Sequence, residues 1–303
     1  MRITPNITMQ NSLYNIQLTR NKLDSINEKI ASGQNYNRPS DDPVAARLLV
    51  GLADKLRTNS QYKSNVDKAA ISLKFTDAPL TAMIETMSNI RSLASIAASS
   101  TTSDLTRQNT ISQLTAYREQ LADYGNTQMG NQYIFAGTMT TTKPFDREVQ
   151  PVPPPLGYSY YKGNDEAIRV EIDAGVTEQT NLSGSQVLTG PDVNILETLD
   201  QLIDKLKNDP TDLTGIKELG TKLDKGAEQI YTAQVTNGTR INRLSAMSQL
   251  LYNTNNTMST VVGNVQNADY AKLAVELQQQ QIAFEATLST TAKISQMSLL
   301  NYL

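Results

Sequence analysis

The sequence predicts a mainly α protein: an elongated antiparallel coiled-coil-like helical rod with a small β-rich insertion and flexible terminal helices. Three observations predict this fold class. Apolar residues recur every seven positions over two long stretches, as in coiled-coil seams. The sequence between these stretches is rich in Pro, Gly and Thr, and each chain end carries a shorter amphipathic repeat. We therefore expect five regions, with bounds at 1–40, 41–139, 140–192, 193–265 and 266–303.

The composition favours thin helical seams over one large core. The 303 residues include no Trp and four Phe, and 39% of them are hydrophobic. Basic and acidic residues nearly balance, at 27 and 30, without a long run of either sign, so we expect no nucleic-acid partner. No apolar stretch approaches the ~18 residues of a membrane span, so we expect no membrane partner. The absence of cysteine favours either a location outside the reducing cytosol or export as an unfolded chain.

The first expected element is an amphipathic helix that ends at Ser32-Gly33, a typical helix stop. A second joint is expected at the poor helix formers in "GNVQNADYA", and a matching helix is expected after it, at the other end of the chain. Isolated helices are marginally stable, so we predict that both stay mobile in the free chain and become ordered when assembly buries their apolar stripes. The apolar residues predicted to form that assembly interface are Met9, Leu13, Ile16, Leu23, Ile30, Leu273, Leu277, Phe284 and Leu288.

Two adjacent carboxylates, Asp41 and Asp42, follow the first helix in a chain without histidine. One reading makes them an acid and a base or a metal site. The other makes Asp42 the N-cap of a long helix, because it precedes Pro43 and Pro is favoured at the first helical position. Asp41 would then add a negative charge near the positive end of the helix dipole. We predict the cap, and we read "ASGQNYNRPSDD" as the joint between the terminal helix and the rod.

The first long ladder begins at Ala45 and has a residue on the seam every seven positions until Ala94. Pro79 lies inside it, and a proline removes a backbone donor, so we expect a kink or short break there. A second ladder runs from Leu223 to Val265 with the same spacing. Each ladder has one asparagine at a seam position, Asn59 and Asn237. A buried seam asparagine fixes the register of paired helices, whereas the alternative is that both face water.

Between the ladders we expect two shorter helices and the insertion. Helical spacing covers 104–124 and resumes from Leu196 until Pro210. In the insertion, Ile168, Val170 and Ile172 alternate with charged residues as in a half-buried strand. The proline cluster "PVPPP" at 151–155 is incompatible with a helix.

Most catalytic sites are excluded by composition. Without His or Cys there is no serine or cysteine triad of the usual kind and no thiolate or imidazole zinc site. No phosphate loop or calcium loop is found, so we expect no enzyme, no metal and no cofactor. A carboxylate hydrolase in the insertion is a distant alternative, and its candidate residues are Asp165, Glu166, Glu171 and Asp173.

Four segments resemble one protein family. "SGQNYNRPSDDPVAA" is similar to the N-terminal region of bacterial flagellins and their relatives, and "NGTRINRL" resembles a rod-helix motif of the same family. "LAVELQQQQIAFEATLSTTAKISQMSLLNYL" is similar to the family's terminal helix. "QMGNQYIFAGTMTTTKPF" resembles the family's hook–filament junction proteins more than its filament flagellins. Together the similar regions cover about the first 145 and the last 85 residues.

The resemblance implies a secreted, extracellular structural protein of the bacterial flagellum, exported unfolded by the flagellar type III apparatus. It implies a hairpin-shaped chain with paired terminal helices, a rod and an outward insertion. The implied partners are the first hook-associated protein, flagellin, neighbouring copies in a ring and a flagellar export chaperone. A filament-forming flagellin is the alternative within the same family.

Overall fold

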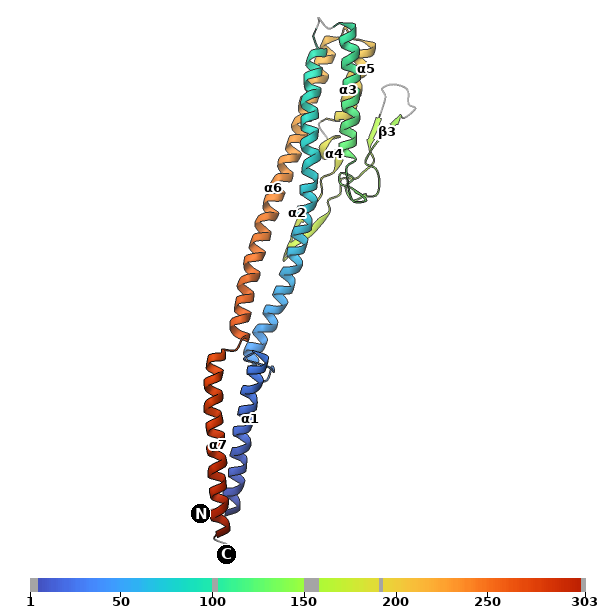
Figure 1. Cartoon of the computed structure of the whole chain (residues 1–303). Coiled ribbons are helices and arrows are strands. Elements are labelled where there is room, and N and C mark those ends of the chain that lie inside the picture. Colours follow the sequence, from blue (N-terminus) through green and yellow to red (C-terminus); the bar gives the residue numbers. More distant parts are fainter. Residues whose placement is uncertain (1–4, 100–102, 150–157, 191–192, 301–303) are drawn as a thin grey trace. The chain divides into compact units, whose positions relative to one another are not determined.

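A computed structural model describes residues 5–99, 103–149, 158–190 and 193–300 (Figure 1). The chain divides into two compact units. The terminal unit comprises residues up to 58 and from 253 onward, and the central unit comprises 59–252. The mainly α fold class with a small β component is confirmed. Among the described helices, none is long and apolar enough to cross a membrane.

The central unit is organised by two long helices, α2 (Pro43–Ala97) and α6 (Leu213–Gln266), which lie side by side (Figure 1). They are antiparallel, because an earlier residue of α2 contacts a later residue of α6, and a later residue of α2 contacts an earlier residue of α6. Ser248 Oγ donates to Asp67 Oδ1 at 3.2 Å, whereas Arg91, further along α2, pairs with Asp224. The seven-residue ladders predict this seam: Leu73, Leu80, Met87, Leu223 and Leu244 are fully buried.

Pro79 does not interrupt α2, so of the expected kink or short break the break is wrong, and the kink stays a prediction. The helix continues for 55 residues with Pro79 inside it. One missing backbone hydrogen bond is tolerated because the next residues, Leu80 and Met83, are fully buried in the core. Burial on one side of the helix outweighs the local penalty.

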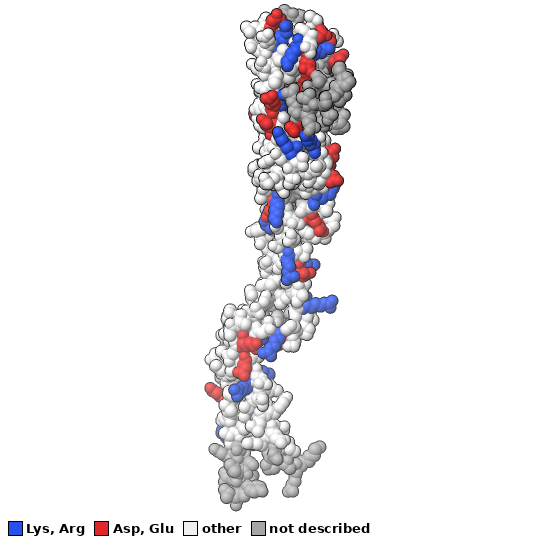
Figure 2. All heavy atoms as spheres, turned by 90° about the vertical axis from the view of Figure 1, so that its right-hand side faces the viewer, with Lys and Arg blue, Asp and Glu red and all other residues white. Residues whose placement is uncertain are grey.

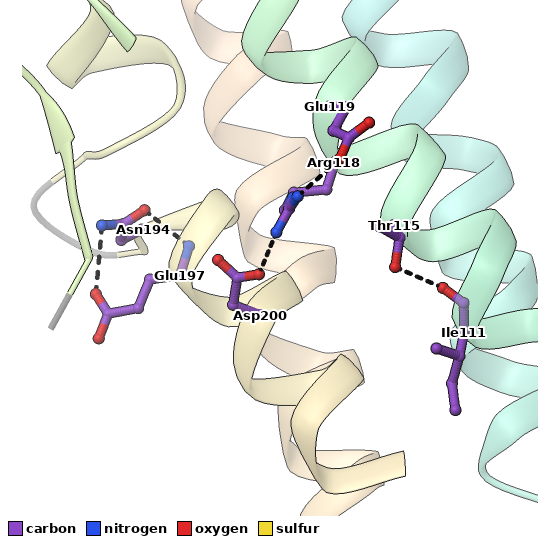
Figure 3. A network of polar contacts seen from close by, with 7 residues as sticks. All are labelled: Ile111, Thr115, Arg118, Glu119, Asn194, Glu197 and Asp200. Atoms are coloured by element: carbon purple, nitrogen blue, oxygen red, sulfur yellow. Dashed lines mark hydrogen bonds and ion pairs between the residues drawn. The ribbon is translucent and has the colours of Figure 1, made fainter. Parts of the chain in front are cut away.

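Two further helices, α3 (Asp104–Gly125) and α5 (Ile195–Asn208), complete the helical part of this unit. Each begins at a capping side chain: Ser103 Oγ accepts from Thr106 N at 3.2 Å, and Asn194 Oδ1 accepts from Glu197 N at 3.2 Å. Figure 3 shows the two helices joined by a buried ion pair. Arg118 Nη1 lies 2.6 Å from Asp200 Oδ1, and both side chains are 6% exposed.

The β structure consists of three antiparallel two-stranded pairs in the described part of the chain. The pairs are β1 (Gln128–Met129) with β2 (Gln132–Tyr133), β3 (Phe145–Val149) with β4 (Tyr158–Tyr161), and β5 (Arg169–Asp173) with β6 (Val176–Gln179). The first pair precedes the predicted insertion, and the proline cluster at 151–155 lies outside the described residues. A short helix, α4 (Gly184–Val187), follows the strands.

The strands are attached to the helical core. Ile172 of β5 is fully buried with Val66 and Leu244, and Asn65 Nδ2 donates to the Glu171 carbonyl at 2.8 Å. Near β4, the Tyr161 hydroxyl donates to the carbonyls of Phe135 and Asn164. Burial raises the pKa of Tyr161 to about 12, which keeps this donor protonated. The insertion is therefore packed onto the α2–α6 seam.

In the terminal unit, α1 (Pro5–Ser32) and α7 (Tyr270–Leu300) lie side by side (Figure 1). Gln280 Nε2 of α7 donates to the Thr19 carbonyl of α1 at 3.1 Å. The helix α1 ends at Ser32, the position that the sequence predicts. The first turns of α2 and the last turns of α6 belong to the same unit.

Candidate assembly surface and joint

The two segments that the sequence predicts as joints lie together in the terminal unit. Asn35 N donates to the Gln266 carbonyl at 2.8 Å, and Ala268 N donates to the Gly33 carbonyl at 2.9 Å. A side-chain bond from Asn35 Nδ2 to the Asn267 carbonyl, 3.3 Å long, adds to them. The turn after α1 depends on Gly33, whose φ of 70° is unfavourable for other residues. The two connections are therefore held by mainly backbone hydrogen bonds.

The predicted cap residues have different roles in this joint. Asp42 Oδ1 accepts from Val44 N at 2.9 Å and from Ala45 N at 3.0 Å, which is the geometry of a helix N-cap. Asp41 Oδ2 instead accepts from the amides of Asn37 and Arg38. Asp41 thus closes the turn before the helix, which is a different contact from the predicted dipole interaction. Pro43 is the first residue of α2.

Sequence reasoning missed a second cap in the same joint. Asp269 Oδ1 accepts from Ala271 N at 2.9 Å and from Lys272 N at 3.1 Å, at the start of α7. The signal was present, because an aspartate directly before a periodic apolar segment is a typical helix start. Both helices that leave the joint thus begin with an aspartate cap.

The predicted interface residues are divided between the α1–α7 contact and the surface. Leu273 is buried, at 4% exposure, and Ile16, Leu23, Ile30, Leu277 and Phe284 are half-buried. Met9, Leu13 and Leu288 are exposed, at 37%, 53% and 43%. The pairing of α1 with α7 thus covers only part of the predicted apolar stripe.

Further apolar side chains in this unit are exposed and were not predicted as interface. On α1 and α7 they include Tyr14, Leu18, Tyr270, Val275 and Ile282. Tyr270 continues the stripe of α7. The other four lie about half a helical turn away from the predicted stripes, on faces that those stripes do not cover. Large contiguous exposed apolar surface indicates an interaction site.

The two predicted register asparagines lie in different environments. Asn237 is fully buried, and its Nδ2 donates to the Leu73 carbonyl at 2.9 Å. Asn59 is half-buried, near the start of the central unit. Only Asn237 lies where a buried polar contact joins α6 to α2, so the register role stays a prediction that now rests on that residue.

The four candidate carboxylates of the hydrolase alternative make separate local contacts. Asp165 accepts from Ser185 Oγ, Glu166 Oε2 accepts from Thr138 Oγ1 at 2.9 Å, and Glu171 Oε1 accepts from Gly175 N. Asp173 Oδ1 accepts from Ala174 N in the turn between β5 and β6. Across the described residues, no group of three or more acidic side chains is placed to hold a metal ion.

Charge is not concentrated on the face shown in Figure 2, where basic and acidic side chains are interspersed over the described residues. Several of these charges form short-range pairs along a helix, such as Lys63 with Asp67 at 2.7 Å. Exposed pairs of this kind contribute little to stability. The exposed apolar side chains of the terminal unit are therefore a more distinctive candidate interaction surface than the exposed ion pairs.

Paired terminal helices, a hydrogen-bonded joint and a long helical seam define a class of helical structural subunit. Residues 3–140 match the family described as bacterial flagellin N-terminal helical region, and residues 221–303 match the bacterial flagellin C-terminal helical region. Together the two regions span more than two thirds of the chain. The chain belongs to the bacterial flagellin family.

Curated relatives within this family carry one name. The chain is similar to flagellar hook-associated protein 3 of Salmonella typhimurium, with 23% identity over 99% of this chain and 98% of the relative. It is also similar to flagellar hook-associated protein 3 of Escherichia coli, with 25% identity over 82% of this chain and 83% of the relative. A solved flagellar hook-associated protein from Vibrio parahaemolyticus has the same fold, with a TM-score of 0.66, 23% identity and coverage of 75% of this chain and all of that one.

Proposed function

We propose that this protein is a non-catalytic structural component of the bacterial flagellum that joins the hook to the flagellin filament. Copies of the chain form a ring between the first hook-associated protein on the hook side and the first flagellin subunits on the filament side. The protein is secreted by the flagellar export apparatus, with an export chaperone as an earlier partner. It functions outside the cell.

The observation that carries this proposal is the incomplete burial of the terminal helices. Among the described residues of the terminal unit, Ala45 and Leu273 are the buried hydrophobic residues, while Leu13, Tyr14 and Ile282 are 53%, 68% and 62% exposed. Burial of apolar surface contributes ~25 cal/mol per Å², so side chains of this size favour association strongly. Neighbouring axial subunits provide that burial.

A junction protein is favoured over a filament flagellin by the segment 128–145. It forms the β1–β2 pair, and its Phe135 and Phe145 are almost fully buried in the core of the central unit. This segment carries the resemblance to junction proteins, and the curated relatives matched along most of their length are named hook-associated protein 3. Filament-forming flagellin is the second candidate, supported by the family match alone.

Deletion of the gene separates the two functions. Loss of a junction protein leaves hooks from which flagellin is shed, so we expect monomeric flagellin in the culture medium and cells with hooks but without filaments. Loss of a flagellin leaves hooks without shed flagellin. Electron microscopy of the cells together with immunoblotting of the medium measures both outcomes, and an empty medium would contradict the junction role.

Direct binding tests the partners. The purified chain is expected to retain the first hook-associated protein and flagellin subunits in a pull-down. The matched control is a chain without residues 1–32, which lacks α1 and should retain less of both partners. Retention of neither partner by the full chain would contradict the proposed position.

A further inference from the structure

An apolar groove lies between α2 and the C-terminal end of α3 in the central unit. It has a volume of about 590 Å³. Ile71 and Phe75 are 60% and 49% exposed, although both are large apolar side chains. The groove is lined by these two residues and by Lys74, Ala78, Pro79, Ala82, Tyr124 and Thr127.

Pro79 and Phe75, one helical turn apart on α2, both line this groove. A proline has no N–H, so the carbonyl of Phe75 lacks the donor that a residue four positions later normally provides. An apolar groove that is open to solvent favours an aromatic side chain that carries a hydroxyl, because its ring fills the groove while its polar end stays hydrated. The groove is thus suited to a tyrosine.

A matching apolar ridge lies on α6 in the same unit. Tyr231 and Val235 are one helical turn apart and are 60% and 50% exposed. The neighbouring positions Ile230 and Ala233 are buried in the core, so the ridge is on the part of α6 that turns away from it.

Groove and ridge lie at the same level along the α2–α6 seam. Asn237 of α6 bonds to the Leu73 carbonyl, and Gln234 Nε2 donates to Thr81 Oγ1 at 2.9 Å. The groove residues on α2 fall around and between Leu73 and Thr81, and the ridge residues flank Gln234. Two copies that stand side by side, in the same direction and at the same height, bring a ridge to a groove.

Charge at the two surfaces is complementary. Lys74 lines the groove, and Glu228 precedes Tyr231 by three residues, which puts it beside the ridge. Neither forms an ion pair within the described part of the chain, and both are exposed. A lysine at one surface and a glutamate at the other add a steering contact to the apolar one.

We propose that the Tyr231–Val235 ridge of one copy docks into the Ile71–Phe75–Pro79 groove of the next copy. The inference rests on the proposed function, because it assigns the side contact within the ring. Groove and ridge are different surfaces, so the contact is head-to-tail, and such contacts repeat from copy to copy until a ring closes. A two-fold symmetric dimer would instead use the same surface twice.

Cross-linking tests this contact cleanly because the chain contains no cysteine. The variant Lys74→Cys/Glu228→Cys is produced in place of the natural chain, and isolated flagella are mildly oxidised. We expect a ladder of dimers, trimers and larger species on a non-reducing gel. Each single variant should remain monomeric. The matched control is Lys74→Cys/Lys217→Cys, in which the second cysteine is moved about 16 Å along α6 and no ladder is expected.

The outcomes separate this contact from the function on which it rests. If the variant chain is present in isolated flagella but gives no ladder, the contact is wrong and the junction role stands. A dimer from either single variant indicates a symmetric contact and also overturns it. If the chain is absent from flagella of cells with the natural sequence, both proposals fail.

Charge reversal gives a second test that needs no cross-link. Lys74→Glu places two acids together at the contact, so we expect about tenfold more flagellin shed into the medium. Lys74→Glu/Glu228→Lys restores the opposite pair and should return shedding toward the natural level. Equal shedding by the single and double variants would contradict a direct Lys74–Glu228 contact.

Discussion

The terminal unit and the central unit are both built from paired helices, yet they differ in what the pairs bury. In the central unit, Leu73, Met87, Leu114, Leu199 and Leu223 are fully buried, and further apolar residues from the strands join them. In the described part of the terminal unit, the buried hydrophobic residues are Ala45 and Leu273. Similar helical periodicity therefore gives a fully buried core in the central unit and a largely exposed apolar stripe in the terminal unit.

This difference indicates two ways of using an apolar stripe. A stripe that meets a partner within the same chain stabilises the folded state of that chain. A stripe that stays exposed stabilises only the assembled state. The comparison leads to four predictions, which run from the largest expected effect to the smallest.

The largest difference is expected in hydrogen exchange of the soluble chain. Amides in the core of the central unit should open only with global unfolding, at ~5–15 kcal/mol, because their helices are fully packed. Amides of α1 and α7 should open at a cost near zero, since little apolar surface holds them. Mass spectrometry of exchanged peptides measures both. Equal protection of α1 and residues 66–94 would remove the distinction between the units.

The next largest effect is expected for the buried ion pair. Asp200→Leu leaves the buried guanidinium of Arg118 with Glu119 alone, a largely exposed partner 3.1 Å from its Nη2, so the free energy of unfolding should fall by up to ~3–5 kcal/mol. The matched variant Arg118→Met/Asp200→Leu removes both charges and should recover most of that loss. Urea denaturation of the two variants gives the comparison, and equal destabilisation would argue against uncompensated charge as the cause.

Truncation of one leucine in each unit compares the two stripes directly. Leu223→Ala removes a fully buried side chain and should cost ~2–5 kcal/mol in the urea transition of the soluble chain. Leu277→Ala, in the half-buried α1–α7 contact, should change that transition by less than ~0.5 kcal/mol but weaken incorporation into flagella. A large loss of monomer stability with Leu277→Ala would show that the terminal helices already fold in the free chain.

A smaller effect than that of Leu223→Ala is expected at the joint. Asp42→Ala removes the acceptor for Val44 N and Ala45 N and should cost roughly 1 kcal/mol of stability in α2. Asp42→Asn, which keeps a capping oxygen, is the matched control and should cost less. Thermal melting monitored by circular dichroism measures the change. A melt unaltered by Asp42→Ala would show that the cap does not contribute.

Much of this architecture follows from local sequence. The seven-residue ladders predict α2 and α6, and "SG" predicts the end of α1, because helix periodicity and caps depend on neighbouring residues. The short break expected at Pro79 is absent for a tertiary reason: the burial of Leu80 and Met83 offsets the free-energy cost of the missing backbone hydrogen bond. The packing of Ile172 against Val66 and Leu244 could not be predicted either, since the three residues are far apart in the chain.

The candidate assembly surface, too, is predicted only in part by the local sequence. A helical stripe identifies the residues that need a partner, but not whether that partner lies in the same chain. Leu273 and Leu13 belong to stripes with similar spacing, yet the former is 4% exposed and the latter 53%. In the joint, the contact from Asn35 N to the Gln266 carbonyl joins backbone groups that every sequence has, and only the bond to the Asn267 carbonyl uses the Asn35 side chain. The identities of these residues therefore do not predict the backbone contact of the joint.

The hydrogen bonds of the joint also determine when in the life of the chain the terminal unit can form. Asn35 and Asn267 are 232 positions apart, so α1 meets α7 only after everything between them has been made or delivered. The β5–β6 hairpin closes over a few residues and needs no such delay. A chain that leaves the ribosome or an export channel with its N-terminus first carries α1 without its partner until the last segment follows. Loss of a few dozen residues from either end would leave the helix at the opposite end unpaired.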